Sequence, residues 1–166
     1  MHRLRALVVA LIALTLSLTG LTTASANASK PRAPEISFLA PVAWATQHKP
    51  DTVQVVGTYR CWGPSTSMHL WVSVKQGGPD PTAEGSSSTV KAWYDTNISQ
   101  DVAVRCNGHW QTTVVDLGRH PTDFSGRPLG YLKNGRAWLQ FCLVSMADES
   151  LLASKSRWVS VVGARH

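Results

Sequence analysis

The stretch that most constrains this chain is residues 53–62, VQVVGTYRCW, in which two kinds of side chain alternate. One face carries Val53, Val55, Gly57, Tyr59 and Cys61, and the other face is mainly polar. A period of two is typical of a half-buried β-strand, whose apolar face needs a partner to cover it. The chain is therefore expected to build its core from further strands packed on that face.

The rest of the chain repeats this pattern in short runs. Strands are predicted at residues 35–46 (interrupted by Pro41), 53–62, 68–76, 89–95, 101–106, 109–117, 136–146 and 156–162. Asn107-Gly108 predicts a type I′ hairpin turn between the two strands that flank it. Segments rich in Gly, Pro and Ser predict loops at residues 77–88 and 118–132. Helix is expected nowhere except for one or two turns within residues 147–154.

Seven or eight short strands with almost no helix predict an immunoglobulin-like antiparallel β-sandwich. A small closed β-barrel is the alternative. The immunoglobulin pattern is incomplete in this chain. Trp71 lies ten residues after Cys61, but its side chain alternates away from its apolar neighbours. The tyrosine expected two residues before the second cysteine is missing as well.

The first 28 residues have the pattern of a secretory signal peptide. Arg3 and Arg5 precede an apolar stretch at residues 6–18, and small residues near position 26 fit an A-x-A cleavage rule. The apolar stretch is short for a bilayer and rich in Ser and Thr toward its end. We therefore expect a cleaved leader at 1–28, a flexible arm at 29–34 and a single domain at 35–166. The mature protein is expected outside the cell, with no membrane attachment.

The charge balance argues against nucleic-acid binding. Sixteen lysines and arginines against ten acidic residues give a formal net charge of +6. The leader holds two of those arginines and no acidic residue, so +4 remains after cleavage. The basic residues are scattered without a run, unlike those of a nucleic-acid-binding surface. We expect a monomer that is weakly attracted to anionic polymers such as cell-wall acids.

Three cysteines, at positions 61, 106 and 142, predict one disulfide and one free thiol in an exported chain. Alternation places Cys61 with Val53 and Val55 on the core side. Cys106 likewise shares a face with Val102 and Val104. Cys142 instead shares its face with Trp138 and Gln140. The predicted pair is Cys61–Cys106, and Cys142 is expected to be a buried, inert thiol.

Four segments carry a resemblance to a known family: GTYRCW at residues 57–62, SVKQGG at 73–78, VRCNG at 104–108 and LKNGRAWLQF at 132–141. Together they resemble a family of small secreted actinobacterial all-β proteins of unknown function. The match covers about residues 52–162, with Asn107 in place of the family's aspartate and Cys142 as an addition. The resemblance implies an exported β-sandwich with Cys61 joined to Cys106, and it implies no activity.

The motifs of hydrolases and metalloenzymes do not occur in this sequence. We therefore expect a non-catalytic protein with no cofactor and no metal site. His120 and Asp123 lie in one predicted loop, where they would suit acid–base chemistry. The alternative interpretation is an ordinary surface loop that contains a proline and exposed polar side chains. The spacing of His69 and His109 gives no support to a metal site.

Tryptophan is the feature of composition that points toward a function, since the chain contains seven. Trp71, Trp93 and Trp138 alternate with polar neighbours on faces opposite the predicted core. Aromatic rings flanked by polar groups form platforms for sugars and other flat ligands. These three residues are therefore the candidate ligand-binding residues. The alternative is that loop 118–132 covers them as a second small core.

The sequence thus favours a secreted binding protein whose partner is a glycan, a cell-wall polymer or another secreted protein. Two alternatives stay open. One is a small secreted hydrolase with an unrecognised site. The other is a proteinaceous enzyme inhibitor that presents residues 77–88 as a rigid loop.

Overall fold

The long strand β3 (Lys49–Arg60) is the element on which the fold closes. The computed structural model describes residues 32–46, 48–99 and 102–164. One edge of β3 pairs along most of its length with β6 (Gln111–Arg119). Two strands share the opposite edge, because β1 (Glu35–Leu39) pairs with the second half of β3 and β2 (Val42–Thr46) with the first half.

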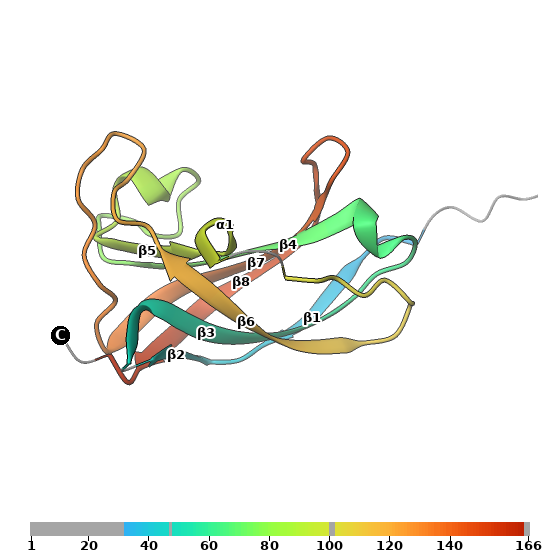
Figure 1. Ribbon diagram of the computed structural model, residues 1–166, viewed down its shortest axis with the longest axis horizontal. Helices are drawn as coiled ribbons and strands as arrows, with labels where there is room; N and C mark the ends of the chain where they lie inside the picture. Colours follow the sequence, from blue (N-terminus) through green and yellow to red (C-terminus); the bar gives the residue numbers. More distant parts are fainter. Residues whose placement is uncertain (1–31, 47, 100–101, 165–166) are drawn as a thin grey trace, which may run out of the picture. The chain divides into compact units, whose positions relative to one another are not determined.

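The remaining strands complete a ring (Figure 1). β2 runs parallel to β8 (Leu151–Val162), which pairs with β7 (Gly135–Ser145). β7 pairs with β4 (Met68–Gln76), and β4 with β5 (Ala92–Asp95). β5 pairs with β6, which returns to β3. The ring β3-β2-β8-β7-β4-β5-β6 is therefore a closed β-barrel, and β1 is an additional strand beside β3.

The predicted all-β class is confirmed, whereas the predicted immunoglobulin-like sandwich is wrong and the small barrel is right. A sandwich consists of two separate sheets, each with its own edge strands. Here β3 has twelve residues and finds partners along both edges, so the sheet curls round and joins itself. Closure of this kind removes the edges that a sandwich leaves unpaired.

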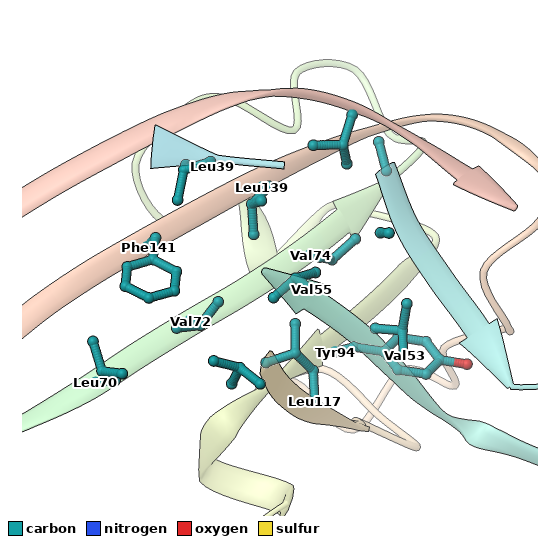
Figure 2. Packing of buried hydrophobic residues seen from close by; sticks show 14 of the residues in the cluster. Leu39, Val53, Val55, Leu70, Val72, Val74, Tyr94, Leu117, Leu139 and Phe141 are labelled. Carbon is teal, nitrogen blue, oxygen red and sulfur yellow. The ribbon is translucent and has the colours of Figure 1, made fainter. Parts of the chain in front are cut away.

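The barrel interior is filled by side chains from the inward faces of its strands (Figure 2). Aliphatic residues from β3, β4, β6 and β7 dominate it: Val53, Val55, Leu70, Val72, Val74, Leu117 and Leu139. The Phe141 ring takes the space where Gly57 has no side chain. A Cβ added at Gly57 would lie 2.4 Å from Phe141 Cε2. The barrel is thus a packed core at this level, and its packing depends on glycine at position 57.

Several predicted elements are confirmed and others are wrong. The interruption at Pro41 and the bounds of β4 agree with prediction. Residues 102–106 form no strand, and Asn107 makes only an isolated bridge to Trp62. The predicted hairpin at Asn107-Gly108 is therefore wrong, because β6 pairs with β3 instead. Of the one or two helical turns predicted within residues 147–154, a single turn is present at residues 146–148, where the Glu149 amide donates to the Ser145 carbonyl, and β8 begins at Leu151.

A short helix, α1 (Thr96–Ser99), replaces strand pairing along part of β4. β5 pairs only with the second half of β4, at residues 73–76. Thr96 Oγ1 accepts a hydrogen bond from the Val72 amide and lies 3.2 Å from the Leu70 carbonyl, to which it donates. One side chain therefore satisfies backbone groups that a neighbouring strand would otherwise pair.

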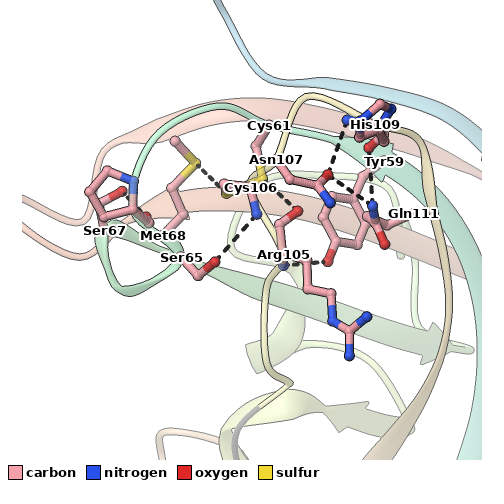
Figure 3. Close-up of a disulfide and its surroundings, with 11 residues drawn as sticks. Tyr59, Cys61, Ser65, Ser67, Met68, Arg105, Cys106, Asn107, His109 and Gln111 are labelled. Carbon is pink, nitrogen blue, oxygen red and sulfur yellow. Dashed lines mark hydrogen bonds between the residues drawn. A yellow bond between two sulfur atoms is a disulfide. The ribbon is translucent and has the colours of Figure 1, made fainter.

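The predicted disulfide Cys61–Cys106 is confirmed (Figure 3). It joins the end of β3 to the unpaired segment 102–106. Two hydrogen bonds reinforce this attachment: the Arg105 amide donates to the Tyr59 hydroxyl, and the Gly108 amide donates to the Cys61 carbonyl. The disulfide thus fixes the stretch of chain that has no strand partner.

The leader predicted at 1–28 and most of the arm predicted at 29–34 lie outside the described residues. Residues 32–34 have no regular structure, and the described residues belong to one compact unit. In the part of the chain that the structure describes, no helix combines the length and the apolar character needed to cross a membrane.

Candidate binding surface

A row of large side chains crosses four strands on the outside of the barrel. Trp93 of β5 lies opposite Lys75 of β4, and Lys75 lies opposite Trp138 of β7. Trp138 in turn lies opposite Trp158 of β8. We call these four residues the tryptophan row. Trp71 is on the same outer face, opposite Cys142. The alternation of the sequence therefore assigned the three candidate tryptophans to the correct side of their strands.

Trp93 is covered and unavailable to a ligand. Only 3% of its surface is exposed. Its indole stacks on the His120 ring, with 3.5 Å between centroids and 5° between planes, and Phe124 packs edge-on against it. Val90 and Leu129 complete a small separate cluster with Trp93. Loop 118–132 therefore forms a second small core at this end of the row, which is the alternative that the sequence left open.

Two side-chain contacts hold loop 118–132 in place as a cover over Trp93. His120 Nε2 lies 2.9 Å from Asp95 Oδ1, where Asp95 is fully buried on the outer face. Asp123 pairs with Arg127 instead, with 2.8 Å between Oδ2 and Nε. The structure thus separates the predicted His120 and Asp123 pair and gives each residue a different partner. Sequence analysis did not identify Asp95 as the partner of His120, because the residues around Asp95 in the sequence give no indication of a contact with a residue so far along the chain.

Asp123 makes the cover sensitive to acid. Its carboxylate accepts hydrogen bonds from the Ser125 hydroxyl and from the amides of Arg127 and Ser125, and these lower its pKa from 3.8 to about 2. A carboxyl whose pKa is lower in the folded state stabilises it above its unfolded pKa, and this contribution disappears as pH falls through the folded value.

We therefore expect loop 118–132 to loosen between about pH 4 and pH 2, with Trp93 becoming accessible to acrylamide. Tryptophan fluorescence quenching measured across this range tests the expectation. Asp123→Asn is the matched control, because its amide keeps an acceptor oxygen but does not titrate. The same acid transition in wild type and Asp123→Asn would contradict the assignment to Asp123.

The middle of the row is buried and polar. Lys75 Nζ donates a hydrogen bond to Ser86 Oγ at 2.9 Å, and burial lowers the Lys75 pKa. Cys142 is the free cysteine, and burial raises its pKa to about 11. A thiol that is both buried and protonated is a poor nucleophile. The prediction of a buried, inert Cys142 agrees with this placement.

The other end of the row is open. Trp158 is 36% exposed and packs edge-to-face with the half-buried Trp138 at 5.2 Å between centroids. The Arg136 guanidinium lies 3.8 Å from the Trp158 ring centroid. Sequence reasoning missed Trp158, although a signal existed. Trp158 shares one face of its strand with Ser156 and Ser160, whereas the buried Val159 and Val161 lie on the other face.

Three polar atoms beside this open end are buried without a hydrogen-bond partner: Ser73 Oγ, Gln140 Oε1 and Trp138 Nε1. Ser73 lies directly opposite Gln140, and Trp138 is two residues away on the same face. Buried polar atoms in native proteins almost always have a partner in the protein, in water or in a ligand. These three atoms make the floor beneath the open end polar.

The other polar residues considered from sequence do not converge on one site. Among the described residues, no group of three or more His, Cys, Asp and Glu side chains is placed to hold a metal ion. His69 lies beside Met146, whereas the His109 amide donates to Asn107 in the turn after the disulfide.

Two comparisons with known proteins give neither a family nor a curated relative. No model of a known protein family matches the chain, and a search of curated proteins finds no significant match. The resemblance to secreted actinobacterial proteins stays a prediction, and the geometry of the outer face carries the functional argument.

Proposed function

We propose that the protein is an exported, non-catalytic binding protein that holds a carbohydrate chain against the open end of the tryptophan row. One observation supports this above the others: the exposed Trp158 packs against the half-buried Trp138, and the Arg136 guanidinium lies over the Trp158 ring. Aromatic faces contact the apolar C–H surfaces of sugar rings, and neighbouring polar groups bind their hydroxyls. A sugar has both kinds of surface.

The charge and shape of the surface narrow the range of sugars that it suits. Arg136 contributes a cation over Trp158, which suits hydroxyl-rich or acidic sugars. The row runs across strands on the outside of the barrel instead of ending in an enclosed cavity. An open surface of this kind fits a polymer better than a single small molecule. Cell-wall polysaccharide is therefore the class of ligand that we propose.

Binding of the mature protein to purified cell-wall polysaccharides, chitin and cellulose tests the proposal, with pull-down and tryptophan fluorescence as readouts. We expect Trp158→Ala and Trp138→Ala each to weaken binding by about 1–3 kcal/mol, as removal of an aromatic anchor does elsewhere. Trp44→Ala and Trp110→Ala are the matched controls, because these tryptophans are similarly exposed but lie outside the row.

The controls decide the outcome. Equal losses in all four variants would show that the binding is non-specific adsorption to exposed indoles. Absence of binding to every polysaccharide by the folded wild-type protein would also refute the proposal. Circular dichroism of each variant verifies that a loss of binding does not come from unfolding.

A further inference from the structure

Sulfur and imidazole donors meet in one cavity at the start of β4. The chain contains three methionines, and the two beyond Met1 are Met68 and Met146. Both line a cavity of about 660 Å³, together with His69. This cavity is separate from the tryptophan row, and binding of an ion there does not depend on the proposed carbohydrate binding.

The closest donors are His69 Nδ1 and Met146 Sδ, which lie 3.0 Å apart. Strand pairing produces this contact. His69 lies opposite Val144, so Met146, two residues beyond Val144, falls on the same side of the sheet. The Met146 amide donates to the Ser67 carbonyl at 2.9 Å, which holds the residue beside β4 after β7 has ended. Met68 is directed elsewhere, with its Sδ 3.8 Å from Cys106 Sγ (Figure 3).

The donor set determines which ion it suits. Thioether sulfur and imidazole nitrogen are ligands that select Cu(I) and similar soft ions, whereas Ca²⁺ and Mg²⁺ require oxygen ligands such as carboxylates. The described residues that line the cavity carry no carboxylate and no ammonium group. Among these described residues, the nitrogen of His69 and the sulfur of Met146 suit a soft monovalent ion better than a hard divalent cation.

Thiolates would compete for the same ion, but the cysteines are not available. Cys61 and Cys106 are joined in the disulfide, and Cys142 is buried. A thioether forms no disulfide under oxidising conditions, so it keeps its lone pairs where cysteines pair. Met146 is 57% exposed, so an incoming ion can approach its side chain from solvent.

We propose that His69 Nδ1 and Met146 Sδ bind a soft monovalent cation of the Cu(I) class. The ion takes the lone pair of Nδ1, so the imidazole keeps its proton on Nε2. Both side chains are at the surface and can separate by rotation to admit the ion between them. Met68, whose sulfur packs on the disulfide, remains outside the coordination.

Nuclear magnetic resonance of the mature protein labelled with ¹³C at the methionine methyl groups tests this site with Ag(I) as the probe, in chloride-free buffer. The mature protein has two methionines, so its spectrum contains two assignable methyl signals. We expect the Met146 signal to shift and saturate near one equivalent of Ag(I), while the Met68 signal stays in place. Calorimetric titration with Ag(I) gives the affinity.

Substitutions separate coordination from a simple hydrogen bond between imidazole and sulfur. We expect Met146→Leu and His69→Gln each to lower Ag(I) affinity about tenfold or more, the scale of losing part of a metal site. Met68→Leu and His109→Gln are the matched controls and should bind like the wild type. The proposal is overturned if the Met146 methyl does not move, if both methyl signals shift alike, or if Met146→Leu retains wild-type affinity.

Discussion

Replacing both Cys61 and Cys106 with alanine will lower the free energy of unfolding by about 4 kcal/mol. The two residues are 45 positions apart, and in the chain-entropy treatment a cross-link of that span restricts the unfolded ensemble by this amount. The bond also holds segment 102–106, which has no strand partner. The loss would be a large part of the stability of an ordinary domain. Equilibrium unfolding in guanidinium chloride measures it.

Cys142→Ala is the control for that experiment. It removes a single buried sulfur from the outer face and breaks no cross-link, so we expect a cost of about 1 kcal/mol. A double variant as stable as the wild type would show that the disulfide adds nothing to the fold. An equal loss in Cys142→Ala would show that cysteine packing, and not the cross-link, accounts for the effect.

Gly57→Ala will destabilise the barrel by about 3 kcal/mol, a large effect for one methyl group. The added Cβ would lie 2.4 Å from Phe141 Cε2, well inside van der Waals contact, and the ring is fully buried. Thermal and chemical unfolding measure the change. Gly130→Ala is the matched control, because a Cβ there would meet only the Lys91 carbonyl at an ordinary 3.6 Å.

A compensating substitution tests the cause. Phe141→Leu shortens the side chain that occupies the space at Gly57, so it should recover part of the loss when combined with Gly57→Ala. The double variant should be more stable than the sum of the two single effects predicts, as expected for residues in contact. Strict additivity would contradict a direct clash between position 57 and the Phe141 ring.

The faces of the strands could be predicted from sequence, whereas their edges could not. Alternation along β3 placed Val53, Val55 and Cys61 inside, and it led to the correct disulfide. The ladder of hydrogen bonds between two strand edges comes from the backbone, which is the same for every residue type. Side chains also meet across β3 and β6, as Gln54 does with Asp116, but they are 62 positions apart and leave no local pattern. The choice between sandwich and barrel depended on that pairing.

The candidate surface was predictable to the same degree. The alternation of side chains placed Trp93 and Trp138 on the outer face, because it depends only on spacing along one strand. The cover over Trp93 depends on His120 reaching Asp95 across 25 positions, which no local pattern records. The Met146 contact with His69 was likewise invisible, since it needs the register of β4 against β7.

The disulfide also decides what happens when the backbone is cut. Cys61 and Cys106 enclose β4, β5 and the glycine-rich connection at 77–88 within one covalent loop. A protease that breaks a single peptide bond in that connection releases no fragment, because the sulfur atoms still join the two pieces. β4 keeps its pairing with β7, and β5 keeps its pairing with β6. One cleavage therefore converts the protein from one chain into two linked chains within the same barrel.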